Sequence, residues 1–201
     1  MVADLTTQTT IFEMASAVLE TVAEHFSLAG FSLGSQVALE IMSIAGERVE
    51  RLALLSATHG GLLPPVEKAI RHAIELIEEG DFNAYLETAY PTYVSPSRIS
   101  DPVVKRCFMD MAHEVGKDAG LRQMRALLGI KSPFANLGQI SCPTLILGGR
   151  NDQRTTPAAH EALAKEIPRS HLVMVDDAAH FTLLEQPSIV AGWMESWIRT
   201  G

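Results

Sequence analysis

Apolar residues recur along this chain at two spacings, and the spacings predict where helices and strands lie. In residues 11–25 apolar side chains return every three or four positions, which is typical of an amphipathic helix. Short apolar runs at residues 26–30, 51–56, 143–148 and 171–175 are bounded by Gly, Pro or charged residues and predict buried strands. Strands that alternate with helical stretches predict an α/β fold, with a mostly parallel sheet and helices on both faces.

The pattern changes in the middle of the chain, where helical periodicity continues without a convincing strand. Helices are expected at residues 66–79, 82–89, 102–115 and 120–128, and a last helix at residues 188–199. A helical insertion therefore interrupts the α/β core. It divides the chain into a first core part (residues 1–63), a helical cap (64–137) and a second core part (138–201).

The pentapeptide GFSLG at residues 30–34 stands between an expected strand and a helix expected at residues 37–45. A sharp turn there strains the central residue and exposes its hydroxyl at the carboxyl edge of the sheet, and glycines on both sides avoid a clash. Ser32 is thus a candidate nucleophile, and the Leu33 N–H is a candidate oxyanion donor at the start of the helix. The alternative is an ordinary Gly-rich turn between a strand and a helix.

A serine hydroxyl needs a base that takes its proton, and the base needs a carboxylate that fixes its tautomer. Among seven histidines, His180 follows the last expected strand and is expected at the same edge of the sheet as Ser32. His59 follows another strand and is the second candidate. Several others, His160 among them, fall within helical patterns, where a packed or solvated role is the default.

Asp152 is the first candidate for the carboxylate. It follows the strand expected at residues 143–148 and lies in a loop rich in turn residues. Asp176 and Asp177 are alternatives, although their position in the same loop as His180 makes the orienting geometry awkward. The three main candidates thus follow three different strands.

The chain resembles the α/β-hydrolase superfamily over nearly its whole length. Residues 26–41 look like the nucleophile strand, elbow and helix of that family. Residues 47–56 look like the next strand, and residues 142–152 and 179–187 look like the acid and histidine segments. The chain order Ser, Asp, His is also that of the family. The chain is most similar to small capped serine hydrolases related to lactonases, esterases and carbon–carbon bond hydrolases, which implies a helical cap and no metal or organic cofactor.

Two departures from the family pattern stand near the amino end. Ser35 occupies the position where the family usually has a second consecutive Gly. The amino-terminal strand of the family, and its loop that donates a second oxyanion N–H, are not found in residues 1–25, so the fold is expected to be amino-terminally shortened. Residues 2–5 resemble a remnant of the strand that follows that loop. The sheet would then have an unpaired edge, which leaves three explanations: truncation of a longer hydrolase, another segment that pairs there, or a second chain in a homo-oligomer.

Charge and composition limit the classes of molecule that this protein is expected to bind. The chain has 16 Lys and Arg against 24 Asp and Glu, a net charge of −8, and no dense basic run, which argues against nucleic acid. No apolar stretch approaches the roughly 18 residues of a membrane span, and no signal peptide is recognisable. We therefore expect no membrane partner and a cytoplasmic location. Cys107 and Cys142 show neither metal-site nor disulfide spacing and are expected to be reduced thiols.

The sequence thus predicts a serine hydrolase that cleaves an ester, a lactone or an activated carbon–carbon bond of a small molecule with an acyl group. The alternative is a non-catalytic or degraded α/β-hydrolase scaffold that lacks a complete oxyanion hole. Cofactor-free haloperoxidase-like chemistry is a further alternative, whereas a dehalogenase would need Asp in place of Ser32. Candidates for the substrate pocket, which helix packing or a solvated helix face explains equally well, are Phe82, Tyr85, Tyr90, Tyr93, Met109, Met111, Arg122, Met124 and Arg125.

Overall fold

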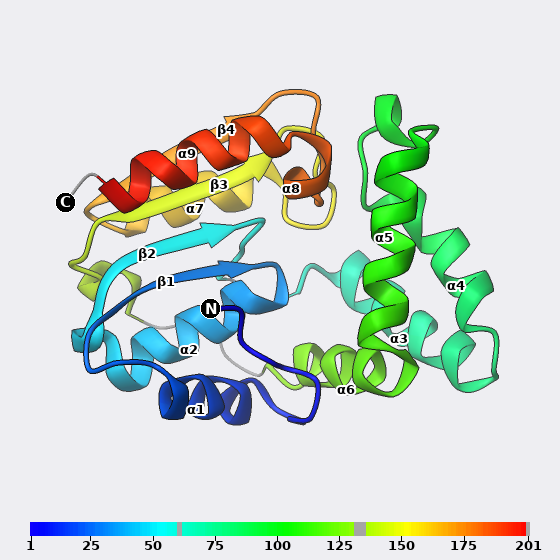
Figure 1. Cartoon of the computed structure of the whole chain (residues 1–201), viewed down its shortest axis with the longest axis horizontal. Helices are drawn as coiled ribbons and strands as arrows, with labels where there is room; N and C mark the ends of the chain where they lie inside the picture. Colours follow the sequence, from blue (N-terminus) through cyan, green and yellow to red (C-terminus); the bar gives the residue numbers. More distant parts are fainter. Residues whose placement is uncertain (60–61, 131–135, 200–201) are drawn as a thin grey trace.

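The computed structural model describes residues 1–59, 62–130 and 136–199. Within them four parallel strands form one sheet in the order β1-β2-β3-β4, and the predicted α/β class is confirmed (Figure 1). The strands are β1 (Phe26–Phe31), β2 (Val49–Leu55), β3 (Thr144–Gly149) and β4 (Ser170–Val175). The α-helices are α1 (Ile11–Thr21), α2 (Leu33–Ala45), α3 (Pro64–Glu78), α4 (Phe82–Ala89), α5 (Pro102–Val115), α6 (Lys117–Leu128), α7 (Pro157–Glu166), α8 (Thr182–Glu185) and α9 (Pro187–Arg199). Short 3-10 helices are η1 (Gly46–Arg48), η2 (Tyr90–Thr92), η3 (Pro96–Arg98) and η4 (Leu137–Gln139).

Both faces of the sheet are buried, which explains why its strands read as uninterrupted apolar runs. Leu52 and Leu54 of β2 point to one face and join an apolar cluster with α1, α2 and α7. Ala53 and Leu55 alternate with them and pack on the other face with Val190 of α9. Helices on both faces hold the four strands, and therefore the loops that follow them, in fixed relative positions (Figure 1).

Helices α3 to α6 lie beyond the carboxyl ends of the strands (Figure 1). Among the described residues between 64 and 137 there are helices and no strand, as the sequence pattern predicts, while residues 131–135 lie outside the described residues. An aromatic cluster joins this helical segment to the core, because the ring of Phe108 in α5 lies 5.5 Å from that of Phe181, just before α8. None of the helices in the described residues is long and apolar enough to span a bilayer.

The ends of the elements agree closely with the sequence pattern, and the differences have local causes. Helix α2 begins at Leu33 rather than at residue 37, because the turn at Ser32 leads directly into it. Helix α1 ends at Thr21 rather than at residue 25, because the backbone becomes extended at Val22. At its start, Thr10 and Glu13 form a capping box, which satisfies backbone N–H groups that have no partner within the helix.

Strand β1 lies at an edge of the sheet in the part of the chain that the structure describes, since it pairs with β2 alone. Residues 2–5 form no strand beside it. Instead, the carbonyl groups of Leu5 and Thr6 accept hydrogen bonds from Gln123 and Arg122 of α6. A groove of about 690 Å³, lined mainly by apolar residues, runs along β1.

The turn between β1 and α2 has glycines on both sides of Ser32, but it needs only one of them. A Cβ at residue 30 would lie 2.2 Å from the carbonyl oxygen of Gly34, because the first turn of α2 approaches β1 closely. A Cβ at residue 34 would meet nothing within 4 Å. The prediction that a glycine is required on each side is therefore right for Gly30 and wrong for Gly34.

We expect Gly30→Ala to destabilise the protein and Gly34→Ala to leave it nearly unchanged. The first variant forces a methyl group into backbone, and overpacking of this kind costs about 1–3 kcal/mol or more. The second has open space and replaces glycine near a helix start, so its effect stays within about 1 kcal/mol. Urea unfolding of the two variants and the wild type measures the difference, and equal stability of the two variants would contradict this account of the turn.

Candidate active site

Ser32 follows β1 in a strained backbone conformation, with φ 49° and ψ −111°. Its N–H donates to the carbonyl of Leu55, at the end of β2, over 2.9 Å. Its carbonyl accepts from the hydroxyl of Ser35 over 2.6 Å and from the Ser35 N–H over 2.9 Å. A buried Ser35 thus fits where the family usually has a second glycine, and it adds a hydrogen bond that holds the turn.

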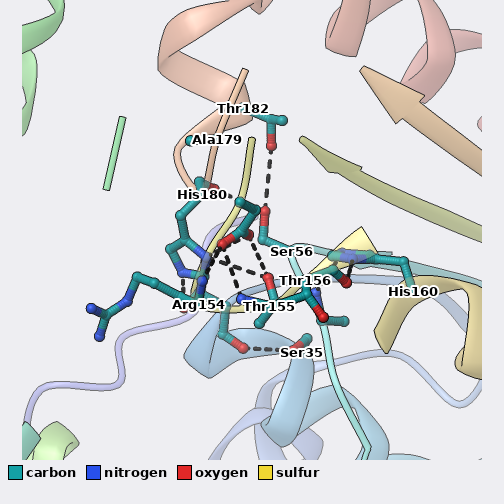
Figure 2. Close-up of polar contacts among 12 residues, drawn as sticks. Ser35, Ser56, Arg154, Thr155, Thr156, His160, Ala179, His180 and Thr182 are labelled. Carbon is teal, nitrogen blue, oxygen red and sulfur yellow. Dashed lines mark hydrogen bonds and ion pairs between the residues drawn. The ribbon is translucent and has the colours of Figure 1, made fainter. Parts of the chain in front are cut away.

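His180 lies between Ser32 and Asp152 and contacts both of them. Figure 2 shows the His180 ring beside Thr155 and Arg154 of the loop after β3. The Ser32 Oγ lies 2.8 Å from His180 Nε2, and His180 Nδ1 lies 2.9 Å from Asp152 Oδ2. A carboxylate only accepts hydrogen bonds, so Nδ1 carries the ring proton and Nε2 is free to accept the serine hydroxyl. The fold therefore brings together the three residues that the sequence selected, in the hydrogen-bonding order that proton transfer requires.

Asp152 is fully buried, and its carboxylate is fully partnered. It accepts from the Arg154 N–H over 2.7 Å, from the Thr155 N–H over 2.9 Å and from the Thr155 hydroxyl over 2.5 Å, besides the contact with His180. Burial pushes the pKa of Asp152 up, but the His180 hydrogen bond and charge and the Thr155 donors outweigh it and bring the pKa below its usual value. Asp152 is therefore ionised at neutral pH and can stabilise a positive charge on His180.

The second candidates from the sequence lie elsewhere. His59 Nε2 faces Glu166 at 3.5 Å and makes no contact with Ser32. Asp176 pairs with Arg150, and Asp177 accepts hydrogen bonds from the hydroxyls of two serines in the loop before α5, at residues 95 and 97. Neither aspartate is the partner of His180.

Two buried side chains that sequence reasoning did not select hold the His180 loop. The hydroxyl of Ser56, which follows β2 with φ 47°, donates to the carbonyl of His180 over 2.8 Å. The carboxylate of Glu185 accepts from the Ala179 N–H over 2.8 Å and from the Ser95 N–H over 2.6 Å. Burial raises the pKa of Glu185, and the two N–H donors oppose that rise only in part. Glu185 therefore ties the His180 loop to the segment between α4 and α5, within the helical insertion.

His160 is a third residue that the sequence pattern treated as ordinary, and it lies fully buried behind the Asp152 loop. Its Nδ1 donates to the carbonyl of Thr156 over 3.0 Å, and its Nε2 accepts from the Ala57 N–H over 3.1 Å (Figure 2). The ring fits there because residue 148 is glycine: a Cβ at Gly148 would lie 2.4 Å from it. Neutral His160 thus ties the end of β2 to the loop that carries Asp152.

Two cavities open beside Ser32, between the carboxyl ends of the strands and the helical insertion. The larger has about 220 Å³ and the smaller about 50 Å³, and Ser32 and Arg154 line both. Of the candidates named from the sequence, Tyr85, Tyr93 and Met124 line the larger cavity. The other candidates lie elsewhere. Tyr90 belongs to a buried aromatic and apolar cluster, against which Phe82 and Met109 pack. Met111 is exposed, Arg125 pairs with Glu78, and Arg122 donates to the carbonyl of Thr6.

The described residues contain no group of three or more His, Cys, Asp and Glu that could hold a metal ion. Cys107 is exposed and Cys142 is half-buried, and both are free thiols. The site itself places a serine, a histidine and a carboxylate in one hydrogen-bonded line next to a cavity.

A family model, curated sequences and solved structures all relate this chain to hydrolases. The chain matches the family described as the alpha/beta hydrolase family over residues 3–193. It is 29% identical over 199 residues to "Putative carbamate hydrolase RutD" of Agrobacterium fabrum, an alignment that covers 92% of this chain and 73% of that protein. It is 25% identical over 189 residues to the pimeloyl-(acyl-carrier protein) methyl ester esterase of Nitrosomonas europaea, covering 87% and 72%. A solved thermophilic esterase from Thermogutta terrifontis superposes with a TM-score of 0.82 at 25% identity, covering 94% of this chain and 72% of that one.

We expect the contribution of His160 to the free energy of unfolding to decrease as the pH falls. Burial lowers the pKa of His160 from its ordinary value of 6.5, so the unfolded chain takes up this proton first as the pH falls. The stabilising contribution of the neutral ring is complete above about pH 6.5 and is lost below it. His160→Gln removes this dependence and costs about 1–3 kcal/mol at neutral pH, because buried hydrogen-bonding groups lose their partner.

Unfolding free energies of the wild type and His160→Gln, measured between pH 7 and 5, isolate this contribution, because the other groups titrate in both proteins. His25→Gln, at an exposed histidine before β1, is the matched control and should follow the wild type. A constant difference between the wild type and His160→Gln across this range would show that His160 does not titrate as described.

Proposed function

Because the chain belongs to the alpha/beta hydrolase family, we propose that it is a serine hydrolase that cleaves an ester, a lactone or an activated carbon–carbon bond of a small molecule. Its curated relatives carry the names of hydrolases and esterases, which supports hydrolase activity. The observation that carries the proposal is the chain of two hydrogen bonds, 2.8 Å from Ser32 Oγ to His180 Nε2 and 2.9 Å from His180 Nδ1 to Asp152 Oδ2.

In the proposed reaction the Ser32 oxygen attacks the carbonyl carbon of the substrate while His180 Nε2 takes the hydroxyl proton. Asp152 holds the ring in position and stabilises the imidazolium. The tetrahedral intermediate then collapses, the bond to the leaving group breaks, and His180 gives its proton to that group. Water repeats the sequence with His180 as base and releases the acid and free Ser32.

The negative charge on the tetrahedral intermediate needs donors that are already in place. We assign one of these donors, the N–H of Leu33. It is the first amide of α2 and lies at the positive end of the helix dipole. One missing donor typically costs about 100- to 1,000-fold in turnover. Turnover is therefore a weaker test of the proposal than formation of a covalent bond to Ser32.

We also propose that helices α3 to α6 act as the cap over this site, with the cavities between cap and core as the place of the acyl group. The larger cavity, at about 220 Å³, is smaller than the roughly 300–1,000 Å³ that drug-sized ligands occupy. Its lining is largely apolar, with tyrosine and threonine hydroxyls. The volume suits a small acyl group, and the lining suits one that is largely apolar.

We expect a fluorophosphonate probe to label the wild type at Ser32 and to leave Ser32→Ala unlabelled. The probe reacts with a serine only where a base activates its hydroxyl, so His180→Ala should also lose most of the labelling. Intact-protein mass spectrometry before and after incubation, with peptide mapping, identifies the modified residue.

Ser43→Ala is the matched control, because this serine lies exposed on α2, the helix that follows the nucleophile. It should label like the wild type. Labelling of Ser32→Ala would refute the assignment of the nucleophile. A folded wild type that never reacts would support the alternative drawn from the sequence, a non-catalytic scaffold.

A further inference from the structure

The two cavities beside Ser32 share one cationic side chain, Arg154, which sequence reasoning did not consider. From its position we propose that Arg154 binds a carboxylate group carried by the substrate, so that this protein acts on anionic rather than neutral acyl compounds. The inference rests on the proposed hydrolase function, because it concerns the substrate of the same site.

The position of Arg154 follows from the loop that carries Asp152. Its backbone N–H donates to Asp152 Oδ1 over 2.7 Å, which fixes where the side chain begins. Its guanidinium carbon then lies 4.1 Å from the centre of the Tyr93 ring, and the Tyr93 ring lies 5.6 Å from that of His180. In Figure 2 the Arg154 side chain extends away from the carboxylate contacts of the loop, past His180.

The guanidinium of Arg154 has no anionic partner among the described residues. In the part of the chain that the structure describes, no carboxylate pairs with it, and no acceptor takes a hydrogen bond from it. Residues 60–61, 131–135 and 200–201, outside that part, include no Asp or Glu. The described residues that line the two cavities also include no acidic side chain. Within the described residues the charge therefore lies over an aromatic ring, beside Ser32, without a carboxylate to compensate it.

The arginines that the sequence suggested for this role are already engaged. Arg122 donates to the carbonyl of Thr6 with two nitrogens, at 2.9 and 2.7 Å. Arg125 pairs with Glu78 at the surface. His72, a basic residue that also lines the larger cavity, is mostly exposed and faces Glu75.

Arginine in this setting is suited to a carboxylate. With one face of the guanidinium on Tyr93, its edge still presents N–H donors in the fork that matches two carboxylate oxygens. Half-burial beside an apolar cavity makes an uncompensated charge costly, and a substrate carboxylate would offset that cost. The protein as a whole carries −8, so the attraction is local to the cavity and does not come from the net field.

Tyr85 adds a second polar group to the same place. It lines the larger cavity, and burial together with the neighbouring Tyr93 raises its pKa, an effect that the charge of Arg154 opposes only in part. Its hydroxyl therefore stays protonated and can donate a hydrogen bond next to the guanidinium.

Two esters that differ only in charge test the inference. Mono-para-nitrophenyl adipate ends in a carboxylate, and para-nitrophenyl adipamate ends in a neutral amide of nearly the same shape. We expect the wild type to prefer the carboxylate by about 10- to 100-fold in kcat/KM, the range of a charge-assisted hydrogen bond. Arg154→Gln should lose most of this preference while it still hydrolyses the amide, and Arg154→Lys should keep a part of it.

Arg125→Gln is the matched control, since it removes an arginine of the helical insertion that does not line either cavity. It should keep the preference of the wild type. Hydrolysis of both esters without a preference, or a preference that survives in Arg154→Gln, would overturn the inference and leave the proposed function standing.

A binding measurement separates the inference from catalysis. A phenyl ketone analogue of the adipate ester, as the acid and as the amide, is titrated calorimetrically into Ser32→Ala and into the double variant that also carries Arg154→Gln. We expect Ser32→Ala to bind the acid about 10- to 100-fold more tightly than the amide, and the double variant to lose this difference. That result would support the role of Arg154 even if the wild type hydrolyses neither ester. Failure to hydrolyse either ester would contradict only the proposed function. Equal binding of acid and amide by Ser32→Ala would overturn the inference.

Discussion

The site depends on one constraint, the common direction of the four strands. Because β1, β2, β3 and β4 are parallel neighbours, the loops that follow them all start at the same edge of the sheet. Ser32 and His180 are 148 residues apart in the chain and yet lie within hydrogen-bonding distance. Burial of both sheet faces fixes the strands, so the positions of these side chains follow from core packing more than from their own contacts.

Two residues at this edge of the sheet have a strained backbone, and both contact His180. Ser32 and Ser56 follow neighbouring strands, and both have positive φ, at 49° and 47°. Each such residue costs on the order of 1–3 kcal/mol. The Ser32 hydroxyl contacts the ring of His180, and the Ser56 hydroxyl donates to the His180 carbonyl. The two strained serines therefore hold His180 at its ring and at its backbone, which limits how far the imidazole can move from the Ser32 hydroxyl.

Sequence reasoning found the parts of this site that have a local signature. The strand, the turn at residues 30–34 and the following helix can be recognised within about 15 residues, and Asp152 and His180 stand out because they follow predicted strands. Ser56 and His160 have no such signature, because their partners come from distant loops that only the register of the sheet brings close. The glycine at residue 148 was a usable clue, since a buried glycine in a strand often marks a close approach.

The loop that follows β3 carries both Asp152, which contacts His180, and Arg154, which we propose as the residue that binds the substrate carboxylate. Asp152 accepts the N–H groups of Arg154 and Thr155, so the turn that presents its carboxylate to His180 also fixes the origin of the Arg154 side chain. Any residue except proline at position 154 can supply that N–H, which leaves its side chain free to vary without loss of the turn. On the proposed role of Arg154, substrate charge is selected here by a single side chain, whereas a change in the length of the loop would displace Asp152 as well. The charge at position 154 can therefore change without a change in proton transfer, although residue 154 is a near neighbour of Asp152.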